Sequence, residues 1–259
     1  MRAAILSIGS ELMQGFLTDT NATFLTQELS AIGVDTVAVF QVGDNLDRIV
    51  TMFRRALDDA DIVIASGGIG PTEDDLTREA IAAVCAEEVY VNENIVEDIR
   101  SFFASRGIVM PDQNVKQAWL IPSAESLANP MGTAPGWFVR HNGKVIACMP
   151  GVPREMRRMF LEQVVPRILP LLSGSVIVSR TLKTIGIGES AAEQAILDII
   201  HEGYPVVATY AKNDGVHIRI TAVSESSDAS QHAVDAMESR LRERIGQYVY
   251  GYLEDSLAA

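Results

Sequence analysis

The chain has 259 residues, 47% of them hydrophobic, and a formal net charge of −13. This length suffices for one large domain or two modest ones with ample core. The negative charge argues against non-specific nucleic-acid binding, which depends on basic side chains that displace counterions. The first apolar run is too short for a signal peptide, and none approaches the roughly 18 residues of a membrane span. We therefore expect a cytoplasmic protein with neither nucleic-acid nor membrane partners.

The first two-thirds of the chain alternates apolar or β-branched runs with amphipathic helical patterns. Strands are predicted at 3–8, 34–42 and 61–66, and helices at 21–32 and 46–57. This alternation predicts a parallel sheet with right-handed crossovers. In such sheets ligands bind beyond the carboxyl ends of the strands, so a site is expected there.

A glycine-rich turn, SGGIGPTEDDLT at 66–77, directly follows the third predicted strand. Gly67, Gly68 and Gly70 lack the Cβ atoms that would hold a ligand away from the backbone, and they allow successive N–H groups to converge on an anion. The helix predicted at 76–85 would add its N-terminus, which also favours negative charge. The pattern predicts a phosphate-binding turn.

Acidic residues close the same turn. Asp74 and Asp75 would repel a phosphate unless a divalent cation lay between them, so the sequence indicates a metal. The alternative is that one of the two aspartates only caps the following helix. Neighbouring helical residues point about 100° apart, so one aspartate can cap while the other faces a ligand.

Three further Gly/Pro turns lie at similar positions, at 9–15, 130–136 and 149–155. Singly each is a tight turn, but together with the glycine-rich turn they outline one pocket floor. Glu11 and Glu155 thereby join the two aspartates as candidate ligands of Mg²⁺ or Mn²⁺, with K⁺ as a further candidate. Glu155 could instead be a first-turn helix acid.

A polar cluster formed by Asn114, Lys116 and Gln117 precedes Trp119. Lys116 could neutralise a phosphate, although a solvated lysine is the simpler interpretation.

The segment Pro166 to Ser175 is the predicted boundary between a domain at 1–170 and a second at 171–259. Beyond it we expect strands at 176–182, 206–210 and 216–223 and helices at 190–200 and 229–245. This order is similar to a KH module and raises RNA binding as a rival hypothesis. However, residues from 175 onward include seven Lys and Arg against twelve Asp and Glu, which favours a packing, lid or dimerisation element.

Several motifs together resemble the N-terminal region of the competence/damage-inducible CinA family, a variant of the molybdopterin-binding fold. They are IGSELMQG with Thr20-Asn21, SGGIGPTEDDLT, NVKQA at 114–118, GTAPG, MPGVPREM, GIGES at 186–190, Tyr210-Ala211-Lys212 and residues 248–251. The resemblance spans nearly the whole chain. It implies an α/β fold, with a three-layer parallel-sheet domain followed by a small α+β, KH-like domain.

The resemblance also implies an activity, namely metal-dependent cleavage of ADP-ribose to AMP and ribose 5-phosphate, with a nucleotide as small-molecule partner and a homo-oligomeric state. Asp75 matches the aspartate common to the wider fold, and Asp74 is the extra acid of this branch. We assign both as catalytic, and Asp75 with Glu11 as metal ligands. The substrate-binding residues expected on this basis are Gly9, Glu11, Asn21, Gly67, Gly68, Gly70, Thr72, Asn114, Lys116, Gly132, Thr133, Pro150, Gly151 and Glu155.

Two departures from the family pattern bear on activity. Ser10 stands where the family usually has Asp or Thr, and Val115 where it has an arginine. Many CinA proteins continue into a nicotinamide-nucleotide deamidase domain, and no such activity is expected of this chain. A molybdopterin-handling protein with the same pocket, or a catalytically silent nucleotide-binding scaffold, remain the alternative hypotheses.

Overall fold

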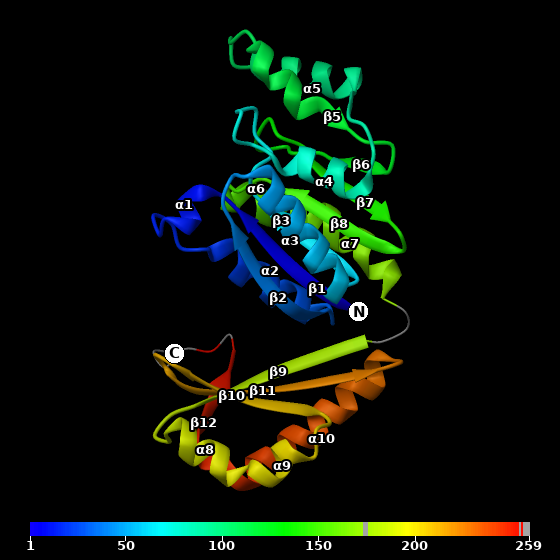
Figure 1. The fold of residues 1–259 in the computed structure, drawn as a ribbon. Coiled ribbons are helices and arrows are strands. Elements are labelled where there is room, and N and C mark those ends of the chain that lie inside the picture. The colour runs from blue at the N-terminus through cyan, green and yellow to red at the C-terminus, as the bar shows by residue number, and fades with distance from the viewer. Residues whose placement is uncertain (173–175, 254, 256–259) are drawn as a thin grey trace. The chain divides into compact units, whose positions relative to one another are not determined.

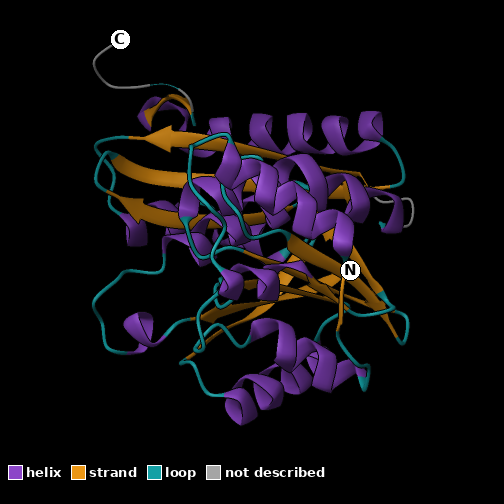
Figure 2. Cartoon of the chain, turned by 90° about the horizontal axis from the view of Figure 1, so that it is seen from above, coloured by secondary structure: helices purple, strands orange, loops and turns teal. Residues whose placement is uncertain are grey.

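The computed structural model describes residues 1–172, 176–253 and 255. These form two compact units, each combining helices and strands (Figures 1 and 2). The first contains Met1–Ser30 and Val34–Leu172, and the second contains Ala31–Gly33 and the described residues after 172. Within the predicted boundary segment, residues 173–175 lie outside the described residues.

A six-stranded sheet of order β2-β1-β3-β8-β7-β6 forms the centre of the first unit (Figure 1). The strands are β1 (Arg2–Ile8), β2 (Asp35–Val42), β3 (Ile62–Ser66), β6 (Ala124–Leu127), β7 (Gly136–His141) and β8 (Lys144–Met149). The four strands β2, β1, β3 and β8 are mutually parallel, whereas β7 and β6 are antiparallel to their neighbours. The predicted parallel-rich α/β fold is confirmed, with an added antiparallel edge.

The antiparallel edge begins at a two-residue hairpin loop between β7 and β8. Asn142 and Gly143 form this loop with φ values of 50° and 75°. Positive φ at both central positions is the type I′ geometry, whose twist matches that of the flanking strands. This hairpin reverses the chain, so that β7 cannot join the sheet in parallel.

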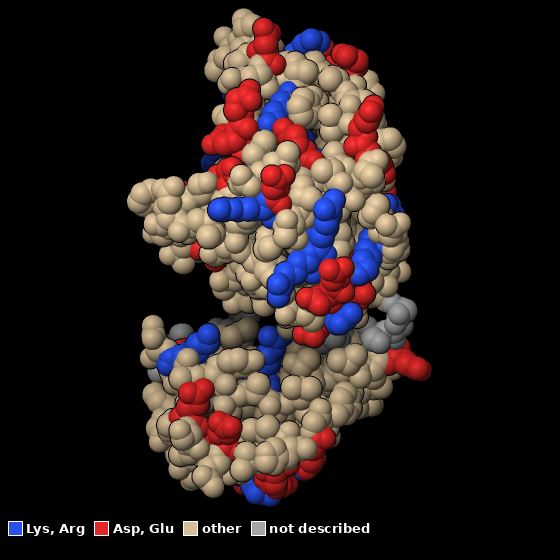
Figure 3. Space-filling view, viewed as in Figure 1, with Lys and Arg blue, Asp and Glu red and all other residues tan. Residues whose placement is uncertain are grey.

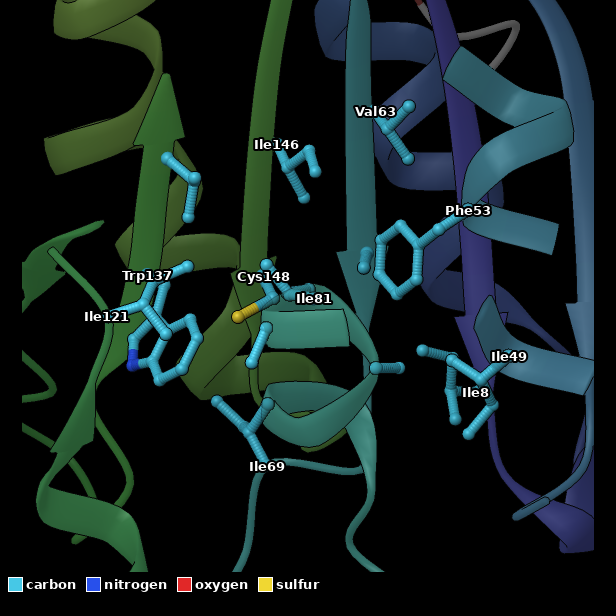
Figure 4. Packing of buried hydrophobic residues seen from close by; sticks show 14 of the residues in the cluster. Ile8, Ile49, Phe53, Val63, Ile69, Ile81, Ile121, Trp137, Ile146 and Cys148 are labelled. Carbon is cyan, nitrogen blue, oxygen red and sulfur yellow. The ribbon is translucent and has the colours of Figure 1, made fainter. Parts of the chain in front are cut away.

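Helices cover both faces of this sheet and complete three layers. Helices α3 (Leu46–Asp59) and α4 (Thr77–Cys85) lie on one face, where Ile49 and Phe53 share a buried cluster with Ile8 (Figure 4). Adjacent strand residues point to opposite faces, and Ile5 and Leu6 of β1 are both fully buried. The second face is covered by α2 (Thr20–Ala31) and α6 (Pro153–Met159), followed by the π-helical turn η2 (Phe160–Val164).

Shorter elements complete the unit. They are α1 (Ser10–Met13), β4 (Tyr90–Val91), α5 (Glu93–Ala104), the 3-10 helix η1 (Asp112–Ala118), β5 (Trp119–Leu120), α7 (Val165–Ile168) and the 3-10 helix η3 (Leu169–Leu171). The Asn92 side chain caps α5 by accepting from the N–H groups of Asn94 and Ile95. Through this cap α5 begins directly after β4, and its apolar face packs on the core.

The second unit is an antiparallel four-stranded sheet of order β10-β11-β9-β12 with helices on one face. Its elements are β9 (Val176–Thr184), α8 (Glu189–Ala195), α9 (Leu197–His201), β10 (Val206–Lys212), β11 (Gly215–Ser224), α10 (Ser227–Ile245), the 3-10 helix η4 (Gly246–Tyr248) and β12 (Val249–Tyr252). The predicted helix at 190–200 is interrupted at Ile196, whose backbone leaves helical geometry at φ −123° and ψ 14°.

An ion-pair network lies on this second sheet. Asp214 accepts hydrogen bonds from the Lys183 ammonium at 2.6 Å and from the His217 ring at 2.9 Å. The hydrogen bond from Lys183 is the main cause that lowers the pKa of Asp214 to about 2. On the face shown in Figure 3, acidic and basic side chains lie interspersed. Within the described residues, no helix combines the length and apolar character needed to cross a membrane.

Candidate functional site

The glycine-rich turn follows β3 and packs against the hydrophobic core. Gly67 and Gly68 have φ values of 102° and 65°, a region that L side chains rarely adopt. A Cβ on Gly67 would collide with the carbonyl oxygen of Ile8, and one on Gly68 with the Thr77 hydroxyl. Both glycines are therefore required by the backbone path itself, whatever the turn binds.

Ile69 anchors the tip of this turn. Its side chain is 2% exposed and packs in the same cluster as Ile81 and Trp137 (Figure 4). Burial of such a side chain stabilises by about 1.5–3 kcal/mol. The Thr77 hydroxyl donates to the Gly67 carbonyl at 2.7 Å, and the Thr77 N–H donates to Gly68 at 3.0 Å. The turn is thus preformed.

The two aspartates of the turn do not cap α4, so the capping alternative is wrong. The N-cap position is Leu76, which makes no side-chain cap. Asp75 instead folds back and accepts from the N–H and the hydroxyl of Thr72, at 2.9 and 2.5 Å. The pKa of Asp74 is held below its ordinary value, chiefly by the Thr72 side chain, whose single hydroxyl proton it shares with Asp75, and next by a backbone N–H. Asp74 is therefore ionised near neutral pH, and the residue is exposed.

A cleft of about 510 Å³ opens above the turn. The lining includes Gly9, Glu11, Asp44, Gly67, Gly68, Gly70, Thr72, Asp74, Asp75, Pro150, Gly151 and Glu155. Loops after β1, β2, β3 and β8 contribute these residues, at the carboxyl ends of the four parallel strands as the sequence predicts. We refer to it as the acidic cleft, because five carboxylates line it and, among its described lining residues, there is no lysine or arginine.

Asp44 lines this cleft and exchanges two hydrogen bonds with Ser10, the first residue of α1. The N–H of Ser10 donates to Asp44 at 2.8 Å, and the N–H of Asp44 donates to the Ser10 hydroxyl at 3.1 Å. Asp44 does not cap α3, because the N-cap is Asn45, whose side chain accepts from the Arg48 N–H. Asp44 therefore fixes the loop that carries Glu11, and Ser10 is part of this contact.

Glu155 fulfils both of its sequence interpretations, since it lies in the first turn of α6 and also lines the acidic cleft. Its carboxylate accepts from the Asn129 amide at 2.8 Å. Gly132 packs directly against it, because a Cβ there would collide with the same carboxylate. Gly132 and Thr133, predicted to hold substrate beside the glycine turn, line a neighbouring groove instead.

Asn21 supports the acidic cleft from behind. Its side chain is buried and donates to the Ser66 hydroxyl and to the Gly151 carbonyl, both at 2.8 Å. It does not belong to the lining. Asn21 ties the end of β3 to the loop after β8, so it fixes the position of Gly151 in the lining of the cleft.

The donor set fits a cation that arrives with its ligand better than a preformed metal cage. Within residues 1–172, 176–253 and 255, no group of three or more His, Cys, Asp or Glu side chains is arranged to hold a metal ion. Mg²⁺ commonly needs only one or two carboxylates, with water and substrate phosphates completing its shell. Asp74, Asp75 and Glu11 could provide these.

Comparison with known proteins places this arrangement in a family. Residues 4–170 match the family described as probable molybdopterin binding domain, and residues 179–251 match the damage-inducible protein CinA KH domain. A crystal structure titled as the protein CinA with unknown function, from Thermoplasma acidophilum, is 34% identical with a TM-score of 0.60, and the match covers 64% of this chain and 96% of that one. The chain belongs to the CinA family.

Curated relatives extend the similarity along the chain. A CinA-like protein from Thermomicrobium roseum is 57% identical over 97% of this chain, and one from Deinococcus deserti is 44% identical over 99%. The matches cover 62% and 63% of those proteins, so the chain spans less than two-thirds of their length. The names of these proteins state no reaction.

The CinA motif segment at 114–118 lies outside the acidic cleft. Asn114 is buried and donates to Gln117 at 2.8 Å. Lys116 is not a solvated lysine, because its ammonium contacts the Thr72 carbonyl at 3.1 Å and pairs with Glu79 at 2.8 Å. This segment braces the glycine turn, and Val115 packs against the core.

Arg78 is the residue that sequence reasoning missed in this CinA chain. Its guanidinium is 1% exposed and donates to the carbonyls of Ile69 and Pro135, at 2.6 and 2.8 Å. Its Nε is buried without a partner. Burial lowers the pKa of Arg78. Because this arginine joins the glycine turn to the GTAPG segment, it fixes two walls around the acidic cleft. An arginine in the first turn of a helix gives no sequence signal for burial.

Proposed function

We propose that this CinA-family chain is a metal-dependent pyrophosphohydrolase that cleaves ADP-ribose, or a related nucleoside-diphosphate sugar, to AMP and a sugar phosphate. One observation supports this most directly: a preformed glycine turn suited to phosphate opens into a cleft lined by five carboxylates. A diphosphate cannot enter such a cleft alone, because like charges repel. The cleft therefore suits a diphosphate accompanied by a divalent cation.

The chain's own groups divide the work as follows. Backbone N–H groups of the turn at 68–70 hold phosphate oxygens, whereas the Gly67 N–H already donates to the Met149 carbonyl at 3.0 Å. Asp74, ionised and exposed, orients the attacking water and accepts its proton, directly or through a second water. Oxygen from water bonds to one phosphorus while the bridging oxygen leaves with the other phosphate. A bound Mg²⁺ or Mn²⁺ would be held by Asp75 and Glu11, and it supplies neutralisation of the phosphate charge.

Asp75 serves this reaction through the shape of the turn as well as through charge. One of its carboxylate oxygens is occupied by the two hydrogen bonds from Thr72, which leaves the other free for a ligand. Thr72 is in turn held at its carbonyl by Lys116. The turn is thus fixed on both sides before a substrate binds.

A second function, molybdopterin binding, is favoured by the family match over residues 4–170. The same turn and cleft could hold the phosphate of a pterin without hydrolysis. The paired acids Asp74 and Asp75 favour the hydrolase, since binding of an anion alone does not require them.

Incubation of the purified protein with ADP-ribose, NAD, FAD and ADP-glucose tests the proposal. Each is combined with Mg²⁺, Mn²⁺ or EDTA, and products are resolved by chromatography. AMP and ribose 5-phosphate from ADP-ribose, formed only with metal and absent from an Asp74→Asn variant, are the expected result. Absence of turnover together with thermal stabilisation by a pterin would replace the hydrolase with a binding role.

A further inference from the structure

A second cavity of about 260 Å³ lies beside the acidic cleft. One wall is helix α5, which contributes Ile95, Ile99 and Phe102, and the other is the segment from Ser126 to Pro135. We call it the α5 groove. Pockets for drug-sized ligands measure about 300–1,000 Å³, so this groove suits a single ring system better than a whole nucleotide.

The α5 groove and the acidic cleft share one wall. Ala134 lines the cleft, whereas its neighbour Pro135 lines the groove. Glu155 of the cleft contacts Gly132 and Asn129 of the groove. The space on the Cβ side of Gly132 is filled by the Glu155 carboxylate and the Asn129 amide, so these two side chains form the boundary between the cavities. A ligand that spans both would pass over this boundary from the cleft into the groove.

This shared wall is rigid before any ligand binds. The Asn129 side chain accepts from the N–H groups of Met131 and Gly132, at 3.1 and 3.0 Å, and donates to Ala134 at 3.1 Å and to Glu155 at 2.8 Å. From the far side Arg78 holds the Pro135 carbonyl. A wall fixed in this way costs little ordering entropy on binding.

The chemistry of the groove differs from that of the cleft. Its described lining contains one charged side chain, Asp98, and the Arg106 guanidinium lies over the ring of the lining residue Phe102, 3.5 Å from its centroid. Among described residues, Asp98, Ser126 and Thr133 line it without a hydrogen-bond partner for their side chains. Apolar walls with a few free polar groups are typical of sites for planar rings, and a carboxylate there favours a ring that carries an amino group.

We infer, on the basis of the proposed function, that the α5 groove binds the amino-substituted heterocycle of the ligand whose phosphates occupy the acidic cleft. An adenine and a pterin both have this chemistry. Gly132 and Thr133 then contact the ring end of the ligand, which explains why they lie away from the glycine turn. Asp98 accepts from the exocyclic amine, and the ring packs against the apolar α5 wall that includes Ile95 and Ile99.

The test fills the groove without touching the cleft. Ala128 lines the groove but is exposed, so Ala128→Trp obstructs the cavity at little cost to folding. Ala104→Trp, on an exposed position of α5 outside the groove, is the matched control. Binding of AMP, ribose 5-phosphate and a pterin is measured by calorimetry in the presence of Mg²⁺.

Ala128→Trp is expected to weaken binding of the ring-bearing ligand at least about tenfold, a change readily resolved in Kd, while ribose 5-phosphate binding and the control stay at wild-type values. Asp98→Asn should weaken the same ligand, whereas Glu97→Gln on the same helix should not. Equal affinity of Ala128→Trp and wild type for both ring-bearing ligands would overturn the inference, as would a wild-type protein that binds neither.

These outcomes separate the groove from the hydrolase proposal. A wild-type protein that binds AMP but leaves ADP-ribose intact would refute the hydrolase, and the loss of AMP binding in Ala128→Trp would still establish the groove. Selective binding of the pterin, lost in the same variant, would identify the other heterocycle. Turnover of ADP-ribose with unchanged AMP affinity in Ala128→Trp would leave the hydrolase and refute the groove.

Discussion

Replacement of Arg78 by methionine tests the view that one buried guanidinium holds two walls of the cleft. Methionine keeps most of the side-chain volume but removes both donors to the Ile69 and Pro135 carbonyls. A buried polar group left without a partner costs about 1–3 kcal/mol, so two carbonyls cost roughly 2–6 kcal/mol. Removal of the buried cation also removes its desolvation penalty, which offsets part of this free-energy cost.

We therefore expect a net loss of about 2–3 kcal/mol of unfolding free energy for the first unit, after the partial offset from the buried charge. At about 2–4 °C per kcal/mol for a domain of this size, the thermal midpoint should fall by roughly 4–12 °C. Arg78→Lys should give a smaller loss, since its ammonium can replace one donor but cannot span both carbonyls. Arg100→Met, at an exposed arginine, should change stability by less than about 0.5 kcal/mol.

Urea denaturation followed by circular dichroism, alongside kcat and KM for ADP-ribose, supplies the assay. Loss of wall geometry predicts that turnover of folded Arg78→Met falls further than its folded fraction, and that added guanidinium partly restores it. A methionine variant as stable as wild type, or less damaging than lysine, would refute the account, because desolvation would then outweigh both hydrogen bonds.

Three further predictions concern single side chains. Asp75→Asn should abolish metal-dependent turnover and leave the thermal midpoint within a few degrees, because the amide oxygen can still accept from Thr72. Glu73→Gln is the control. A large stability loss with unchanged specific activity would make Asp75 purely structural. Gly67→Ala should lower the free energy of unfolding by at least about 1–3 kcal/mol. The loss should exceed that of Gly107→Ala, a glycine that also has positive φ but has open space around it. Equal losses in chemical denaturation would contradict the predicted collision of the new Cβ with the Ile8 carbonyl oxygen. Asp214 has a folded pKa of about 2, below its ordinary 3.8, so its stabilising contribution is present above pH 3.8 and is lost as pH falls through 2. Unfolding curves of wild type and Asp214→Asn should converge over this window, and a constant gap would show that the pairing does not depend on the charge of Asp214.

Local patterns predict the parallel half of the sheet well, because each strand and the helix after it are adjacent in sequence. The antiparallel edge was missed although Asn142-Gly143 is a strong hairpin signal. Helix α5 was missed too, although Asn92 supplies a cap and Ile95 and Ile99 have helical spacing. Both signals are local, so the hairpin and the helix can be recognised from the sequence alone.

The sequence predicts which loops form the site, but not the direction of each side chain within it. Strand order brings the four turns together, which is why most predicted residues line one cleft. The direction of each side chain depends on partners distant in sequence: Asp44 pairs with Ser10 across 34 positions, and Arg78 reaches Pro135 across 57. Gly132 likewise packs against Glu155, which is distant in sequence, and no spacing rule predicts this contact.

The charge pattern of the acidic cleft has a thermodynamic consequence. The carboxylates alone would bind a hydrated cation only weakly, and they would repel a diphosphate that arrives alone. Each of the two ligands would therefore raise the affinity of the cleft for the other. Such coupling is reciprocal: the factor by which a cation raises diphosphate affinity equals the factor by which the diphosphate raises cation affinity. Under the proposed function, occupancy of the cleft would therefore depend on the concentrations of both the cation and the diphosphate, and not on either one alone.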